Sequence, residues 1–245
     1  SLWRSRSTKM LDHFSEKASG YGLKLNFAKT KVMTWSHLAK GCTSIRVGQQ
    51  LVDVLVDETT EKYLGRKLCF RDVHQVELQY RLACAWAALH KHKGELCSKY
   101  YCLKDRIKLF DAVVSATLLY GCASWAMTQS MEKALQTQRR RMLRYVLRIY
   151  RKTLAETWVE YLQRSAATID EVSTKHCMLE WVAECRRRKW RYVGKLAVIQ
   201  DEFWSVEILS WKPVHGHGRC AGRPLTRWSD SIENDVGGDW FNVAK

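Results

Sequence analysis

Proline is nearly absent from this sequence. The 245 residues contain two prolines, Pro213 and Pro224, so the first 212 residues have none. Proline breaks helices because it lacks a backbone N–H and its ring clashes with the preceding turn. Long helices can therefore run through most of the chain. Hydrophobic residues make up 46% of the sequence, which is enough to bury a core and excludes a wholly disordered chain.

Apolar residues recur at helical spacing from about residue 72 onward. The first series is Leu78, Leu82, Trp86 and Leu89, and the second is Ile107, Phe110, Val114 and Leu118. Residues three or four positions apart lie on one face of a helix. Each series therefore predicts a helix with one buried face.

Residues that cap helices predict where two further helices begin. Thr128 or Ser130 is a suitable N-cap for a helix over residues 130–150. A T-x-x-E capping box starts at Thr168, and in such a box the two side chains bond to each other's backbone N–H groups. A fourth, long helix is therefore predicted from this box to about residue 196.

The first 71 residues predict a small β-rich layer. Residues 9–19 predict a short helix that ends at Gly20. Residues 22–35 then predict a strand, a turn at "NFAKT" (residues 26–30) and a second strand, residues 44–56 predict two more short strands, and residues 61–70 continue in extended form.

These patterns together predict an α+β chain that is mainly α-helical. We expect three parts, which are the β-rich layer (residues 1–71), a helical domain (residues 72–155) and a basic helical region (residues 156–245). A short amphipathic helix around residues 227–235 is expected to close the chain.

Positive charge narrows the class of partner. Lys and Arg number 41 against 25 Asp and Glu, which gives a formal net charge of +16. A chain this basic repels itself unless an anion offsets the charge, and nucleic acid is the usual anion. The net charge is also consistent with binding to an acidic membrane surface, and with a basic protein that has no specific anionic partner.

The cysteines and the apolar segments indicate the compartment. Nine cysteines occur without a C-x-x-C pair, and no positively charged segment followed by an apolar one opens the sequence. We therefore expect reduced thiols in an intracellular protein of the nucleus or cytoplasm. Residues 112–131 carry no charge, but their Ser, Thr, Gln and Gly residues favour a buried helix and a turn over a membrane span.

Residue types that bind zinc occur in the C-terminal third of the chain. They are His176, Cys177, Cys185, His215, His217 and Cys220. A structural zinc site normally includes two cysteines separated by two to four residues, and this spacing is absent. We therefore predict no metal site, and we expect histidines and thiols without a metal. The motifs of serine hydrolases, P-loop proteins and HExxH proteases are absent as well.

An arginine row marks the predicted third helix. In "RRRMLRYVLRIYRK" (residues 139–152), Arg140, Arg144 and Arg148 share one face at intervals of four. Met142, Val146 and Ile149 point toward a core. Stacked like charges cost helix stability, so a sequence that keeps them favours a phosphate partner. The alternative is a face that is simply solvated.

A second basic stretch, "CRRRKWRYVGK", covers residues 185–195. Arg187, Lys189 and Arg191 alternate there with Trp190 and are followed by Tyr192. Cations next to aromatic rings suit single-stranded or structured nucleic acid, because bases stack on the rings while phosphates are neutralised. The alternative is that Trp190 and Trp181 are core residues of the fourth helix.

Several segments occur in an order that resembles a known family. They are "GLKLNFAKTKVM" from Gly22, "KYLG" at residues 62–65, "KLFDAVVSATLLYGCASW" from Lys108, the two basic stretches, and "GRPLTRW" at residues 222–228. This order resembles the C-terminal part of reverse transcriptases from LINE-type (non-LTR) retrotransposons, over roughly residues 9–235. The resemblance implies an end of the palm in residues 1–71, a thumb in 72–155 and the C-terminal region in 156–245.

The resemblance implies a role for the lysines of the first segment. "GLKLNFAKT" is similar to motif D of that family, which lies beside the nucleotide site. Lys29 would lie near the leaving pyrophosphate as an accessory group, and Lys24 and Lys31 would face nucleic acid. The alternative is that Lys29 and Lys31 solvate a turn.

Other matched positions imply further nucleic-acid contacts. Tyr63, Leu64 and Gly65 resemble the primer grip, where the backbone turns against the primer end. Arg223 and Arg227 lie in the "GRPLTRW" signature. The family's "RWxGH" appears here as "RYVGK", so the usual histidine is replaced by a lysine.

The sequence lacks the family's catalytic pair of aspartates. Polymerase chemistry there uses carboxylates that hold two metal ions, usually in an Asp-Asp turn, and no Asp-Asp occurs in this chain. We therefore expect a fragment that binds RNA and DNA, as template–primer or target DNA, without catalysis of its own. It would need no cofactor, whereas the full enzyme would need Mg²⁺. The alternatives are a basic nucleic-acid-binding host protein derived from a retroelement, and an inert remnant.

Overall fold

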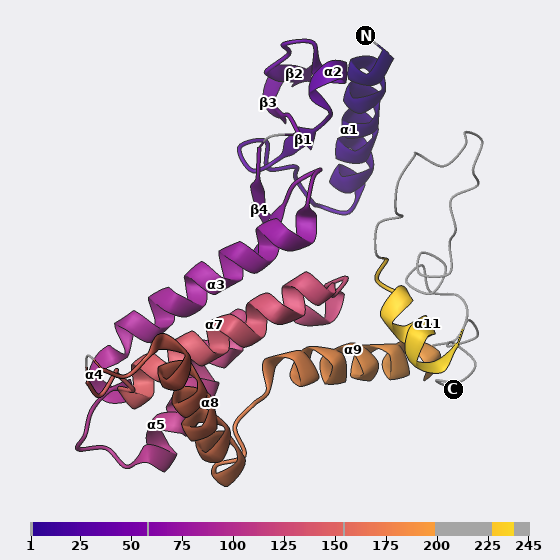
Figure 1. Cartoon of the computed structure of the whole chain (residues 1–245). Coiled ribbons are helices and arrows are strands. Elements are labelled where there is room, and N and C mark those ends of the chain that lie inside the picture. Colours follow the sequence, from indigo (N-terminus) through magenta and orange to yellow (C-terminus); the bar gives the residue numbers. More distant parts are fainter. Residues whose placement is uncertain (1, 58, 154, 199–226, 238–245) are drawn as a thin grey trace. The chain divides into compact units, whose positions relative to one another are not determined.

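The computed structural model describes residues 2–57, 59–153, 155–198 and 227–237. The chain divides into two compact units, residues 1–77 and residues 78–245 (Figure 1). The fold is α+β and mainly helical, so the predicted fold class is confirmed. The predicted limits of three parts, after residues 71 and 155, stay predictions.

A three-stranded sheet and one long helix form most of the first unit. Strand β3 (Gln50–Leu55) lies in the middle, parallel to β1 (Lys31–Met33) and antiparallel to β2 (Ser44–Val47). The β2–β3 hairpin matches the strands predicted within residues 44–56, and its turn uses the positive φ of Gly48. Alternating residues of β2 and β3 face α1 (Leu2–Gly20) and form the core: Ile45, Val47, Val52 and Val54, with Trp3 and Leu11 of α1 packed against them.

Of the two strands predicted within residues 22–35, only the second forms, as β1. The turn predicted between them is present, because the Asn26 carbonyl accepts hydrogen bonds from the N–H groups of Lys29 (3.0 Å) and Thr30 (2.9 Å). Leu23 is 64% exposed, so the apolar alternation there does not correspond to a buried strand face.

The remaining elements of the first unit are short. Helix α2 (Ser36–Ala39) begins where the buried carboxylate of Asp57 accepts a hydrogen bond from the Ser36 N–H (2.9 Å). Strands β4 (Glu61–Tyr63) and β5 (Arg66–Leu68) pair in a hairpin. Its two turn residues, Leu64 and Gly65, both have positive φ (48° and 80°), as a tight hairpin with a right-handed twist requires.

The described part of the second unit is helical. Its elements are α3 (Val73–Lys91, which starts in the first unit), α4 (Lys93–Leu96), α5 (Leu103–Leu109), the π-helix η1 (Phe110–Ser115), α6 (Ala116–Leu118), the 3₁₀ helix η2 (Cys122–Ser124), α7 (Gln129–Leu147), α8 (Trp158–Lys175), α9 (Trp181–Val198) and α11 (Asp230–Val236). Both predicted apolar series contribute to one core, which includes Leu78, Leu89, Phe110, Val114 and Leu118. None of the helices in the described ranges is long and apolar enough to cross a membrane.

Helix boundaries agree with the sequence at α7 and differ after it. Thr128 caps α7 by accepting a hydrogen bond from the Met131 N–H (3.3 Å), as predicted. The predicted fourth helix is instead two helices, α8 and α9. The chain between them passes through Cys177, whose φ of 49° cannot continue a right-handed helix.

The capping box begins at Thr157, about three helix turns before the predicted position at Thr168. Thr157 accepts a hydrogen bond from the Glu160 N–H (3.3 Å), and the Glu160 carboxylate accepts one from the Thr157 N–H (2.8 Å). Thr168 lies inside α8, where its hydroxyl donates to the Arg164 carbonyl (3.0 Å).

A polar network fixes the segment between α8 and α9. Asp111 accepts hydrogen bonds from the Ser115 hydroxyl (2.9 Å) and the Leu179 N–H (3.1 Å), and the Trp181 indole donates to the same hydroxyl (2.8 Å). Arg139 of α7 donates to the Leu179 carbonyl (3.0 Å) and is buried. Arg139 therefore supports the fold, although it opens the arginine-rich stretch.

Candidate nucleic-acid interface

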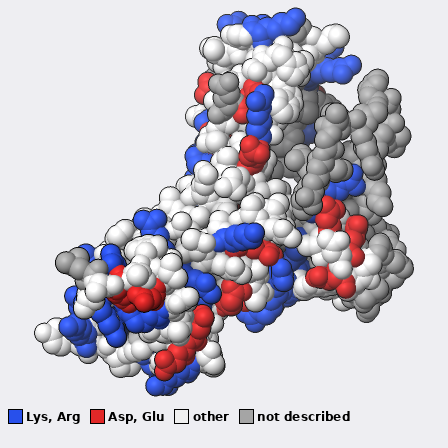
Figure 2. All heavy atoms as spheres, in the orientation of Figure 1, with Lys and Arg blue, Asp and Glu red and all other residues white. Residues whose placement is uncertain are grey.

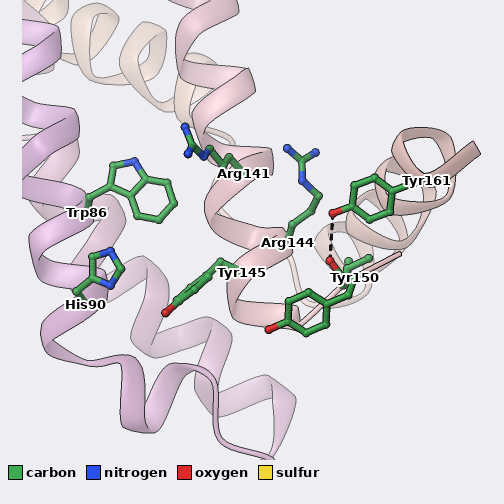
Figure 3. Close-up of a pocket in the computed structure, with 8 residues that line it drawn as sticks. Trp86, His90, Arg141, Arg144, Tyr145, Tyr150 and Tyr161 are labelled. Carbon is green, nitrogen blue, oxygen red and sulfur yellow. Dashed lines mark hydrogen bonds between the residues drawn. The ribbon is translucent and has the colours of Figure 1, made fainter. Parts of the chain in front are cut away.

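Aromatic and arginine side chains line a surface cavity of about 650 Å³ in the second unit (Figure 3). Trp86 and His90 come from α3, and Arg141, Arg144 and Tyr145 come from α7. The other lining residues are Ile149, Tyr150 and Tyr161. Figure 3 shows Tyr145 between His90 on one side and Tyr150 on the other.

The rings on the α3 side hold fixed positions relative to one another. The Trp86 and His90 rings are stacked, with centroids 5.8 Å apart and planes 28° apart. Tyr145 meets His90 at a 71° interplanar angle (5.8 Å). The Trp86 indole donates a hydrogen bond to the Gln138 side chain (3.2 Å), and the Arg141 guanidinium lies 5.6 Å from the Trp86 ring centroid. These contacts preorganise a corner of aromatic rings with a cation beside it.

A second, smaller cavity adjoins the first through Tyr145 and Tyr150. It is lined by Lys93, Gly94, Cys97, Ser98, Tyr145, Arg148 and Tyr150. The Lys93 ammonium lies 5.7 Å from the Tyr145 ring centroid, and hydrogen bonding with Tyr145 raises the pKa of Lys93. The Lys93 ammonium is therefore a cation beside the Tyr145 ring.

We call the two cavities together the arginine–aromatic groove, defined by Trp86, His90, Lys93, Arg141, Arg144, Tyr145, Arg148, Tyr150 and Tyr161. Its described lining contains four Lys and Arg side chains and no carboxylate. Figure 2 shows Lys and Arg side chains gathered over the end of this unit that holds α4, α5 and α8, next to smaller groups of Asp and Glu. The groove therefore carries an excess of positive charge on an aromatic surface.

Two partly buried arginines outside the groove, Arg106 and Arg164, hold its walls in place. Arg106 donates to the Leu96 carbonyl (2.7 Å) and to the Val146 carbonyl, so it ties the end of α4 to the last turn of α7. Burial lowers the pKa of Arg106. Arg164 donates to the Tyr150 carbonyl (2.9 Å) and pairs with Glu156 (2.7 Å), which fixes the backbone that carries the Tyr150 ring.

The predicted arginine row is only partly present. Arg140 is exposed, Arg144 is half-buried in the groove, and Met142, Val146 and Ile149 are buried as expected. Helix α7 ends at Leu147, however, and Arg148 is its C-cap in a left-handed conformation (φ 57°). The three arginines therefore do not form one straight row on a helix, but Arg144 and Arg148 both line the groove.

Most of the second basic stretch is occupied by contacts within the fold. Arg187 and Arg188 both pair with the buried carboxylate of Glu184, at 2.5 Å and 2.7 Å. The Lys189 ammonium is buried, and it donates to the Trp228 carbonyl and to the Ser231 hydroxyl (2.7 Å). Lys189 was predicted to contact nucleic acid; in this structure its charge faces α11 and not solvent.

The other members of this stretch have mixed surroundings. Arg191 is exposed, and so is Arg227, whose backbone N–H donates to the Asp230 carboxylate (2.7 Å). Trp181 is fully buried, so the core interpretation holds for it, whereas Trp190 is partly buried against a small cluster of Val193 and Ile232. Arg223 lies outside the described residues.

The predicted residues before residue 77 belong to the first unit, and the groove belongs to the second. Lys24 and Lys29 are exposed, and Lys31 pairs with Glu61 (2.9 Å). Tyr63, Leu64 and Gly65 form the end and turn of the β4–β5 hairpin, with Tyr63 and Leu64 exposed. Their roles in contacting a primer stay predictions.

The aromatic members of the groove were not predicted from the sequence. Trp86 was assigned to an apolar core series, and no binding role was predicted for His90, Lys93, Arg141, Tyr145 or Tyr150. One signal was present, because Trp86 and His90, and likewise Arg141 and Tyr145, are four residues apart and share a helix face. In the described ranges no group of three or more His, Cys, Asp and Glu could hold a metal, and His215, His217 and Cys220 lie outside those ranges.

Comparison with known proteins gives one informative similarity. An uncharacterized transposon-derived protein of Caenorhabditis elegans is 27% identical over 231 residues, which cover 94% of this chain and 78% of that protein. The similarity supports a transposon origin for the chain. No family model matches the sequence, and no solved structure matches it.

Proposed function

We propose that this chain is a nucleic-acid-binding part of a non-LTR retrotransposon reverse transcriptase, and that the arginine–aromatic groove contacts the nucleic acid. The observation that carries the proposal is the composition of the groove, where four cations lie among aromatic rings without a carboxylate in the described lining. Phosphates need the cations, and bases can use the rings. The transposon-derived relative and the ordered family-like segments support the retrotransposon assignment.

The test measures binding of 20-nucleotide single strands of RNA and DNA by fluorescence anisotropy over a range of NaCl concentrations. The variant replaces Arg141, Arg144 and Arg148 by Gln. Removing three phosphate contacts should weaken binding and flatten the slope of log Kobs against log[salt] by about 2 on single strands. Thermal melts confirm that the variant folds.

A charge-matched control separates local contacts from overall charge. It replaces three exposed lysines that line neither cavity, Lys104, Lys133 and Lys175, by Gln. This control loses the same net charge, but its slope of log Kobs against log[salt] should stay close to that of the wild type. Equal losses in the two variants would contradict a specific interface in the groove, and wild-type protein that binds no oligonucleotide at low salt would favour the inert-remnant alternative.

A further inference from the structure

The groove combines cationic and aromatic side chains, and these contribute differently to binding a duplex and to binding a single strand. A duplex presents phosphates and groove edges, and its base faces are covered by stacking. A single strand presents both phosphates and open base faces, which stack on aromatic side chains. Rings in the groove therefore add little to duplex binding and much to single-strand binding.

Among the rings of the groove, Tyr150 and His90 are exposed, Tyr145 and Trp86 are half-buried, and Tyr161 is buried. Tyr150 is 61% exposed, while its backbone is fixed by the hydrogen bond from Arg164 to its carbonyl (2.9 Å). Tyr145 lies between His90 and Tyr150 and belongs to the linings of both cavities (Figure 3). Side chains with two rotatable bonds on a fixed backbone give contact area at low entropic cost.

Cations lie on both sides of these rings. Arg144 lines the larger cavity, Arg148 and Lys93 line the smaller one, and Tyr145 and Tyr150 are common to both. A strand that follows the groove would thus pass from one cation to the rings and on to the next cations. This arrangement matches the alternation of phosphate and base in a single strand.

We propose that the groove binds single-stranded nucleic acid, with an unpaired base stacked on Tyr145 and Tyr150 and the adjoining phosphates on Arg144 and Arg148. This inference rests on the proposed nucleic-acid binding and adds the form of the ligand. The cavity of about 650 Å³ lies within the size range of pockets that enclose small organic molecules, so it has room for a base.

The first experiment compares three ligands of equal length by anisotropy at one salt concentration. They are a 12-nucleotide DNA single strand, a strand of the same backbone in which every nucleotide is abasic, and the 12-base-pair duplex. The single strand should bind roughly tenfold tighter than the abasic strand for each stacked base. Equal affinity for the abasic strand, or tighter binding of the duplex, would overturn the inference while leaving nucleic-acid binding intact.

The second experiment tests the ring itself. Tyr150→Ala should reduce single-strand affinity severalfold and leave abasic-strand affinity unchanged, whereas Tyr150→Phe should keep both because it keeps the ring. Tyr100→Ala is the matched control, because Tyr100 is 99% exposed and lines neither cavity. An equal loss in Tyr100→Ala, or no loss in Tyr150→Ala, would contradict the stacking. Absence of binding to all three ligands would instead contradict the proposed function.

Discussion

Lys189 is an ionisable residue buried inside the second unit. It is 6% exposed, donates to the Ser231 hydroxyl at 2.7 Å, and has its ammonium 4.7 Å from the Trp228 ring centroid. Burial lowers the pKa of Lys189 to about 8, although Asp230 and Asp235 act in the opposite direction. The lysine thus links α9 to α11 at an electrostatic cost that depends on pH.

This burial predicts a stability that rises with pH. Below pH 8 Lys189 is charged in both folded and unfolded chains, and between pH 8 and about 10.5 the unfolded chain binds more protons. The free energy of unfolding should therefore rise through that interval, by about 3 kcal/mol from this residue alone. Denaturant titrations at pH 7, 8.5 and 10 measure the effect as the difference between wild type and Lys189→Met. Parallel pH profiles for the two proteins would show that Lys189 titrates normally.

Neighbouring arginines in one stretch of sequence have different surroundings. Arg139 is buried against the Leu179 carbonyl, Arg140 is exposed, and Arg141 lies beside the Trp86 ring. Successive residues of a helix point about 100° apart, so a run of like residues is distributed around the helix. A run of charge in the sequence therefore does not by itself identify which charges face a ligand.

At the scale of elements, local sequence patterns predicted some strands and helix starts correctly. They failed where the same motif occurs at more than one position. The β2–β3 hairpin followed from alternation and Gly48, and the start of α7 followed from Thr128. Three T-x-x-E matches occur, at Thr153, Thr157 and Thr168, and of these Thr157 forms the capping box of α8. The pattern alone does not distinguish the match that caps a helix from the match at Thr168, which lies inside one.

The groove was predictable only in part for a similar reason. Arg144 and Arg148 were selected from their spacing in one helix. Trp86 and Tyr145 lie 59 positions apart and meet only because α3 packs against α7, with ring centroids 6.5 Å apart. Sequence spacing identifies residues that share an element, and packing decides which elements meet.

The C-terminal end of α7 contains an arginine where glycine is usual. Arg148 has φ 57° and ψ 43°, and its N–H donates to the carbonyls of Arg144 and Tyr145. The left-handed conformation costs a residue with a Cβ roughly 1–2 kcal/mol, and glycine avoids this cost. Arg148 therefore makes the end of α7 less stable than glycine would, while its side chain lines the groove.

Replacing this residue should separate stability from binding. Arg148→Gly is expected to raise the free energy of unfolding by about 1 kcal/mol and to weaken oligonucleotide binding. Arg148→Ala loses the same charge but keeps the Cβ, so its stability should stay near that of wild type while its binding falls as in the glycine variant. Urea titration and anisotropy measure the two effects. A less stable glycine variant would show that the Arg148 side chain supports the fold.

At the scale of the whole molecule, the excess of positive charge is not removed by ion pairs. In the described second unit, Glu132, Glu156 and Glu184 are each paired with arginine, yet the sequence has 41 basic against 25 acidic residues. Unpaired cations repel one another in the folded state more than in the expanded unfolded state. This repulsion destabilises the fold, and the same charge attracts polyanions.

Salt should consequently change stability and binding in opposite directions. Raising NaCl from about 20 to 300 mM screens the repulsion between exposed charges, so the melting temperature should rise, while nucleic-acid affinity should fall. The variant with Lys104, Lys133 and Lys175 replaced by Gln lowers the net charge from +16 to +13 and should show a smaller rise in melting temperature. Differential scanning fluorimetry without nucleic acid measures the first effect, and anisotropy measures the second. A melting temperature that falls with salt would mean that favourable ion pairs such as Arg164–Glu156 outweigh the repulsion between like charges. The net charge would then not destabilise the fold, and stability would give no reason to expect an anionic partner.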